Sequence, residues 1–271
     1  MIGGVELRKS RNLGQIVGDS FTIYGATWRI LAAVVIPIVV TALAFELILY
    51  AVNDDISKAA YNSQELQDRI DAQGDNYQPD VSPISVLAIV LIIPIGAAVY
   101  VLSSAGGVAY LSRTDLGESL TSAEALDDAQ SRFGALIGST VRALAICIGL
   151  ACTIVGIPFA VIRGIRWLFI SQVIMIEGLS GPGVLARSAD LVRNQWWVTL
   201  GRMIVTGLVI QIPVAIVTSI VAAAAPGVIS ILVGVCAAFI TTPYAIIATT
   251  LIFFDYQVRK APKPNDSFSL A

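Results

Sequence analysis

Three charged residues interrupt long apolar runs and are the best placed to do chemistry in this chain. Glu46 lies near the end of the run 28–50, and Arg163 and Arg166 lie inside the run 159–176. A carboxylate and a guanidinium at a similar distance from the ends of their runs can form an ion pair. We expect Glu46 to pair with Arg163 or Arg166. An anion or lipid-headgroup site, and snorkelling of the arginines, are the alternatives.

Other chemistry lacks the residues it needs. The chain has no histidine, which excludes histidine general bases and the common zinc and haem sites. Cys147, Cys152 and Cys236 lie in apolar runs without CxxC spacing, so we interpret them as small buried hydrophobes rather than metal or redox residues. With no nucleophile–base pair or phosphate loop either, we expect no catalytic residue, no cofactor, no metal and no nucleic-acid partner. The protein is not expected to be an enzyme.

The composition is that of an integral membrane protein. Of the 271 residues, 56% are hydrophobic and 13% are charged, about half the charge of a soluble domain. Several apolar runs reach the roughly 20 residues that a helix needs to cross a bilayer. They lack the alternation of barrel strands. We predict an all-α fold with six transmembrane helices, at residues 28–50, 85–111, 135–155, 159–176, 198–224 and 228–254.

The distribution of basic residues predicts the orientation. Ten of the 17 lysines and arginines lie in the N-terminal segment, the second-to-third and fourth-to-fifth connections, and the tail. The opposite side has Lys58 and Arg69. Because cytoplasmic loops are enriched in basic residues, both termini are expected in the cytoplasm.

The segment 183–197 predicts an amphipathic helix in the membrane interface. Its apolar residues share one helical face: Val184, Leu185, Leu191, Val192 and Trp196. Its polar residues share the other: Arg187, Asp190, Arg193 and Asn194. Pro182 suits the first turn, Trp196 and Trp197 suit headgroup depth, and both arginines lie three residues from Asp190, which permits weak ion pairs.

Similar segments precede the other odd-numbered spans. Residues 13–25 precede the first span and residues 122–134 precede the third, with Asp19, Asp128 and Asp190 at corresponding places. We therefore predict a pseudo-threefold repeat of surface helix, span, span. Gene duplication and a shared topological constraint both account for it.

We expect one transmembrane domain, 1–260, followed by a flexible cytoplasmic tail, 261–271. The acidic loop 51–83 lies outside the cell as a partly helical cap or, in our preferred interpretation, a solvated tether. Small-residue stretches at 103–107 and 134–138 predict close helix packing within the chain, with contacts between copies as the alternative.

Four short motifs resemble one bacterial and archaeal membrane family. Glu177-Gly178, Arg187-Ser188, Leu191 and Trp196-Trp197 match its E-G pair and A-x-R-S-x-x-L-x-x-x-x-W helix. The residues that resemble its N-terminal helix are Leu13, Gly14, Ile16, Phe21 and Tyr24. Pro158 matches a proline between two of its spans, and "FFDYQVR" resembles its closing element. The family is the membrane domain sometimes fused to glycerophosphoryl diester phosphodiesterases. The resemblance implies that the protein lies in the cell (inner) membrane of a prokaryote. Phosphodiesterase activity is not implied, because that chemistry belongs to a separate soluble barrel that uses histidines.

Two functions remain open. The preferred one is a non-catalytic scaffold or accessory subunit that contacts membrane lipids and other membrane proteins or further copies of itself. The alternative is a small transporter or permease for an anionic or lipidic solute, with Arg163 and Arg166 at its site. Prolines inside four spans and Gln211 in the fifth fit a transporter, although prolines are ordinary in membrane helices.

Overall fold

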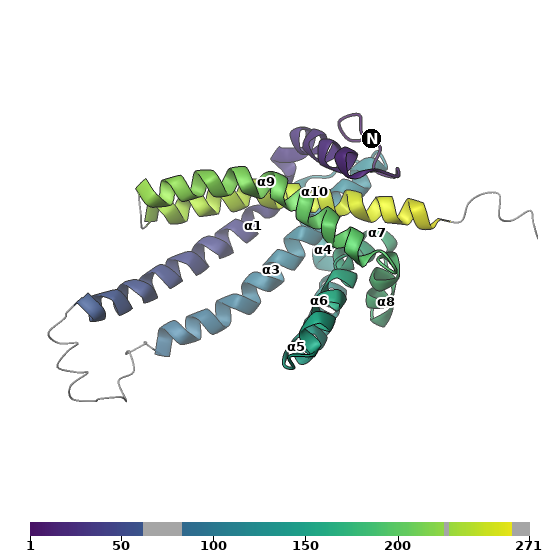
Figure 1. Cartoon of the computed structure of the whole chain (residues 1–271). Coiled ribbons are helices and arrows are strands. Elements are labelled where there is room, and N and C mark those ends of the chain that lie inside the picture. The colour runs from purple at the N-terminus through teal and green to yellow at the C-terminus, as the bar shows by residue number, and fades with distance from the viewer. Residues whose placement is uncertain (62–82, 225–227, 262–271) are drawn as a thin grey trace, which may run out of the picture.

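The computed structural model describes residues 1–61, 83–224 and 228–261 of the chain (Figure 1). Within these residues the regular structure is helical, apart from an isolated bridge between Ile2 and Val5. The long helices are α1 (Leu13–Tyr61), α3 (Pro83–Asp115), α9 (Trp196–Ala224) and α10 (Val228–Lys260). The shorter ones are α4 (Ser122–Ser131), α5 (Phe133–Ala151), α6 (Gly156–Arg166), α7 (Ile170–Glu177) and α8 (Pro182–Leu191). The predicted all-α class is confirmed.

Among the described residues, six segments are long and apolar enough to cross a membrane, which is the predicted number. They are Leu13–Leu49, Val90–Asp115, Phe133–Ala151, Gly156–Glu177, Trp196–Ala224 and Ile229–Lys260. Each overlaps the run predicted for it. The agreement follows from length and apolar composition, the two properties that decide whether a helix can reach across a bilayer.

Helix α1 is longer than the first predicted span. Helix α1 continues without a break from Leu13 to Tyr61, so the predicted loop 51–83 begins as helix. The sequence after Tyr50 has no glycine or proline before Tyr61, which explains why the helix does not stop at the end of the apolar run. The remainder of that loop, 62–82, and most of the predicted tail, 262–271, lie outside the described residues.

The fourth span consists of two helices rather than one. Helix α6 ends at Arg166 and α7 begins at Ile170, with a turn at 167–169 between them. Ser188 of α8 lies against this turn and is fully buried. Its hydroxyl donates to the Arg166 carbonyl at 2.9 Å and accepts from the Phe169 N–H at 3.3 Å. A residue distant in sequence therefore pairs two backbone groups that the break leaves open.

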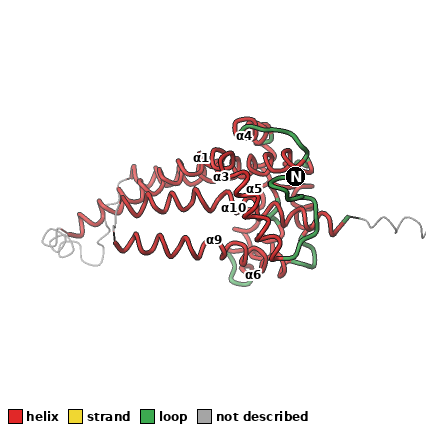
Figure 2. Tube along the Cα trace, turned by 90° about the horizontal axis from the view of Figure 1, so that it is seen from above, coloured by secondary structure: helices red, strands yellow, loops and turns green. Residues whose placement is uncertain are grey.

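The long helices pack in an extended group. Helix α1 contacts α3 and α10, and α10 also contacts α9, which runs beside it (Figures 1 and 2). Close approach depends on Gly107 in the stretch 103–107, where an added Cβ would lie 2.9 Å from a side-chain carbon of Ile246. The predicted close packing within the chain is therefore present here. At Gly134 and Gly138 an added Cβ would meet nothing within 4 Å, so the second stretch does not pack closely.

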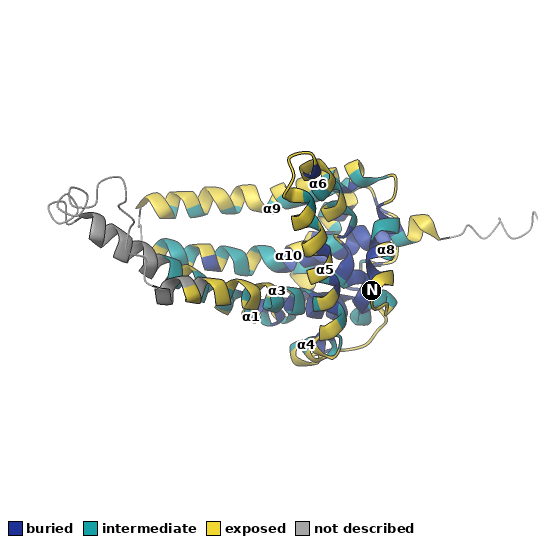
Figure 3. Cartoon of the chain, turned by 90° about the horizontal axis from the view of Figure 1, so that it is seen from below, coloured by how far each residue is buried: buried dark blue, intermediate teal, exposed yellow. Residues whose placement is uncertain are grey.

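Burial is concentrated at one end of the molecule. Dark blue residues in Figure 3 gather near α8 and the N terminus, whereas α9 is exposed along most of its length. We call this densely packed end the polar end, because buried and half-buried ion pairs also lie there. It consists of the N-terminal segment 1–12, helices α4 and α8, and the adjoining ends of α3, α7, α9 and α10. Segment 1–12 is bonded to α3 and α10.

The three predicted surface helices differ from one another. Helices α4 and α8 are separate from the spans that follow them, but residues 13–25 form the first turns of α1. The predicted apolar residues Val184, Leu185, Leu191 and Val192 of the α8 segment are buried against the protein. Placement of these segments in a membrane interface, and the threefold repeat, stay predictions.

Candidate functional site

A buried carboxylate is the centre of the polar end. Asp255 on α10 has an exposed fraction of 0%. It accepts hydrogen bonds from the Arg11 backbone N–H at 2.7 Å, from Arg202 Nη1 at 2.5 Å and from Arg259 Nε at 2.8 Å. A buried carboxylate without partners would cost several kcal/mol, so these donors are what allow it to be there.

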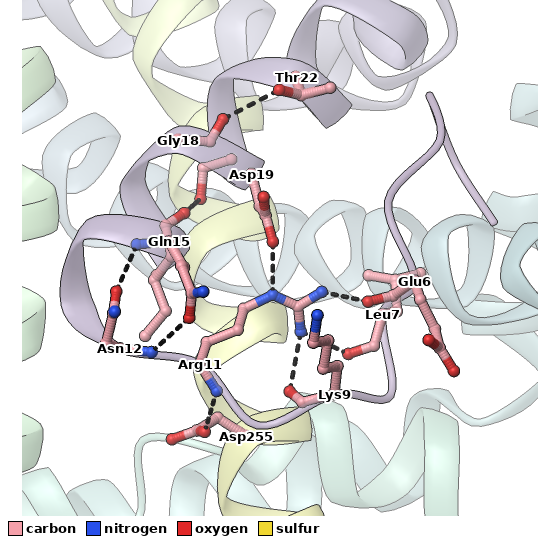
Figure 4. Close-up of polar contacts among 12 residues, drawn as sticks. Glu6, Leu7, Lys9, Arg11, Asn12, Gln15, Gly18, Asp19, Thr22 and Asp255 are labelled. Carbon is pink, nitrogen blue, oxygen red and sulfur yellow. Dashed lines mark hydrogen bonds and ion pairs between the residues drawn. The ribbon is translucent and has the colours of Figure 1, made fainter.

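Arg11 fixes the N-terminal segment to this centre (Figure 4). Its side chain is 2% exposed, and its Nε lies 2.7 Å from the carboxylate of Asp19 on α1. Its Nη1 donates to the carbonyl groups of Leu7 and Lys9 at 2.8 and 3.0 Å, and its Nη2 donates to that of Glu6. One guanidinium therefore holds the preceding loop in shape while the backbone of Arg11 contacts α10.

A second contact holds the same segment to α3. The backbone N–H of Leu7 donates to Asp115 at 3.5 Å, and Arg8 lies 3.6 Å from the same carboxylate. The Arg8 guanidinium also lies 5.7 Å from the ring centre of Phe254 on α10. The N-terminal segment thus joins the ends of α1, α3 and α10.

A paired arginine and glutamate connect α7, α8 and α10. Arg187 donates from Nε and Nη2 to the two carboxylate oxygens of Glu177, both at 2.8 Å. Gln257 of α10 donates to the same Glu177 at 3.3 Å. The hydrogen bonds to Glu177 raise the pKa of Arg187 above its already high normal value, which keeps the guanidinium charged. Glu177 and Arg187 were both singled out in the sequence, but their pairing was not.

The predicted pairs around Asp190 form in part. Arg187 lies 3.6 Å from the Asp190 carboxylate, as predicted. The other partner of Asp190 is Lys260 of α10, at 3.7 Å, in place of the predicted Arg193, whose described contact to it is a backbone bond. Trp196 and Trp197 stack with ring centres 4.0 Å apart, and Trp197 is 68% exposed.

The expected ion pair between Glu46 and Arg163 or Arg166 does not form. Glu46 lines a cavity of about 410 Å³ with Thr218 and Ser219 of α9 and residues of α10, near the ends of those helices. The two arginines lie on α6, which forms a hairpin with α5. This hairpin points in a different direction from α1, α9 and α10 (Figure 1). Equal depth along the sequence does not bring two helices together laterally, which is why the prediction failed.

The two arginines have different surroundings. Arg163 is exposed, with its guanidinium carbon 5.6 Å from the ring centre of Trp167. Arg166 is half-buried, and its Nε has no hydrogen-bond partner among the described residues. An anion or lipid-headgroup site at these residues stays a prediction.

The described ion pairs of the polar end hold different segments of the chain against one another. Three of its carboxylates, those of Asp19, Glu177 and Asp255, face a guanidinium group at hydrogen-bond distance. Arg202 and the central role of Asp255 were not predicted from the sequence. The pair could have been predicted, because Arg202 and Asp255 are charged residues near the ends of two consecutive apolar helices. A charge in such a helix is costly unless an opposite charge pairs with it.

Comparisons with protein-family models, with curated proteins and with solved structures found no match to this chain.

Proposed function

We propose that this chain is a non-catalytic integral membrane protein of a prokaryotic inner membrane that serves as a scaffold or accessory subunit. Its helical faces contact lipid and partner membrane proteins. One observation supports this most directly: α9 is long enough to cross a bilayer, yet its buried residues are Thr199 and Thr206. Because so little of α9 is covered by the rest of the chain, most of its surface is free to contact lipid or a partner protein.

The exposed surface of α9 has the form of a packing ridge. Branched apolar residues recur at every fourth position: Ile204, Leu208, Ile212, Ile216 and Ile220 are all exposed. Side chains four residues apart form the ridges that fit into the grooves of a neighbouring helix. We call these five residues the α9 ridge and propose that it receives a helix of a partner membrane protein.

The polar end gives this ridge a fixed base. Arg202 near the start of α9 is held to buried Asp255 of α10, and the Thr199 hydroxyl lies 2.8 Å from that of Tyr256. The start of α9 is therefore tied to α10 while the ridge beyond it stays uncovered. We further propose that the chain belongs to the membrane-domain family that its motifs resemble, on the strength of those residues alone.

The transporter is our second candidate. Neither Arg163 nor Arg166 lines the cavities described between α1, α3, α9 and α10. These two cavities therefore do not support the solute site proposed on those arginines.

Photocrosslinking in native membranes tests the accessory role. A benzophenone amino acid at Ile212 or Ile216 is expected to give the same discrete protein adduct from both positions. Trp substituted at the other ridge positions, Leu208 and Ile220, is expected to abolish that adduct, because a bulky side chain spoils helix packing but is tolerated by lipid.

The matched control places Trp at Ile93 and Ile95 of α3, which are similarly exposed. These changes should leave the adduct intact. Adducts with lipid alone at both ridge positions would contradict a role as an accessory subunit.

A further inference from the structure

A second cavity lies between the middle parts of α9 and α10. Its volume is about 310 Å³, at the small end of the range for ligand pockets. Its wall includes Tyr100 of α3, Thr206 and Gln211 of α9, and Tyr244 and Thr249 of α10. Its lining residues carry hydroxyl and amide groups but no charge. We call it the hydroxyl cavity.

One buried polar atom in the wall of this cavity and one beside it have no hydrogen-bond partner among the described residues. Tyr244 is 1% exposed, and its hydroxyl oxygen is one of them. The other is Oε1 of Gln172 on α7, which is 5% exposed and donates from Nε2 to Thr249 at 3.3 Å. A buried unpaired polar group costs about 1–3 kcal/mol, and lipid offers no hydrogen bond in exchange. A ligand whose hydrogen-bond acceptor reaches the Tyr244 hydroxyl would satisfy the group that lines the cavity.

The cavity lies within membrane-spanning segments. Met203 and Gln211 are well inside the span Trp196–Ala224, and Thr241 and Thr249 are well inside Ile229–Lys260. Tyr100 and Gln211 are exposed at its edge. At this depth an exposed edge faces lipid rather than water, so a ligand enters sideways from the bilayer.

The uncharged lining selects the chemistry of the ligand. An ion would lie in a medium of low dielectric constant without a counter-charge, which is strongly unfavourable. We propose that the hydroxyl cavity binds the uncharged glycerol ester headgroup of a neutral lipid of the diacylglycerol class. The Tyr244 hydroxyl donates to an ester carbonyl, the free lipid hydroxyl bonds to the Gln211 amide at the edge of the cavity, and the acyl chains stay in the bilayer. This lipid site does not depend on whether the chain also binds a partner protein through α9.

Photolabelling of the full chain in phosphatidylcholine nanodiscs tests this assignment. The probe is a diacylglycerol with a diazirine close to its glycerol, and the labelled residues are mapped by mass spectrometry. Labelling is expected at residues of the hydroxyl cavity. Unlabelled diacylglycerol should compete, whereas free glycerol and phosphatidic acid should not.

Two substitutions with matched controls locate the site. Gly207 lines the cavity and an added Cβ there meets nothing within 4 Å, so Gly207→Leu should fill the cavity and abolish labelling without disturbing the fold. Gly201→Leu is equally open on the same helix but lies outside the cavity, and it should label normally. Tyr244→Phe should weaken competition about three- to tenfold, the loss of one hydrogen bond, and Tyr110→Phe should not.

Three results would overturn the proposal. The first is labelling that survives Gly207→Leu. The second is equal competition by phosphatidic acid, which would contradict an uncharged site. The third is equal competition by free glycerol, which would assign the cavity to a soluble polyol instead of a lipid.

Discussion

Asp255 shows how a single residue can organise an otherwise apolar protein. It lies among the aromatic residues of α10, yet Arg202 and Arg259 and the backbone of Arg11 satisfy its carboxylate oxygens. Three elements that are distant in sequence meet at this one side chain. Buried charge of this kind is costly to assemble and still more costly to break, because removing one partner leaves the others buried and unpaired.

The substitution Asp255→Asn tests this role. It removes the negative charge and leaves Arg202, whose side chain is 13% exposed, without a full counter-charge, so we expect a loss of about 3 kcal/mol in the free energy of unfolding. For a chain of this size that corresponds to a fall of roughly 6–12 °C in the thermal midpoint in detergent. Asp190→Asn is the matched control: its carboxylate is about half exposed and its ion pairs are longer, so a loss under about 1 kcal/mol is expected. Equal midpoints for the two variants would show that the buried network does not stabilise the fold.

At the scale of elements, the break between α6 and α7 depends on α8. The Ser188 hydroxyl bonds to the Arg166 carbonyl and the Phe169 N–H, one on each side of the turn. Arg187 next to it holds Glu177 at the other end of α7. Helix α8 therefore sets the angle at which the fourth span bends, although it does not itself cross the membrane in the predicted topology.

Ser188→Ala should loosen this break. Two buried backbone groups lose their partner, with an expected cost of about 1–3 kcal/mol. Hydrogen exchange of the amides at 167–170 should rise, while exchange in the middle of α10 should not. Ser131→Ala on α4 is the control, because its hydroxyl bonds only to the nearby Asp128 carbonyl at an exposed site. Unchanged exchange at 167–170 would rule out the bridging role of Ser188.

At the scale of the whole molecule, the polar end and the long exposed helices have different tasks. The polar end fixes the relative positions of α1, α3, α9 and α10, and the helices extend from it with large apolar surfaces uncovered (Figure 3). The surplus of lysine and arginine in the connections at this end predicts that it faces the cytoplasm.

Cysteine labelling tests the orientation. In a variant with Cys147, Cys152 and Cys236 replaced by alanine, a single cysteine is placed at Ser180, which is exposed between α7 and α8. We expect it to react with a membrane-impermeant maleimide only after the cells are permeabilised. A cysteine at Ser63, in the predicted external loop, should react in intact cells. The opposite pattern would invert the topology.

The sequence by itself determined the number of spans and the helical class. Both depend on local properties, the length and apolarity of each run, which the chain carries whatever its neighbours are. It also placed Arg187 beside Asp190, because residues three apart on a helix are always close. The resemblance to a membrane family drew attention to Glu177 and Asp255, but not to what either one contacts.

Only the tertiary structure decided which helices lie side by side. It separated Glu46 from Arg163 and Arg166, paired Asp255 with Arg11 and Arg202, and exposed Cys152 and Cys236, which we had expected to be buried. In a bilayer every apolar helix face is compatible with lipid, so hydrophobicity does not specify which face meets another helix. That choice is made by small residues such as Gly107 and by buried polar pairs, and these act only between segments that are distant in sequence.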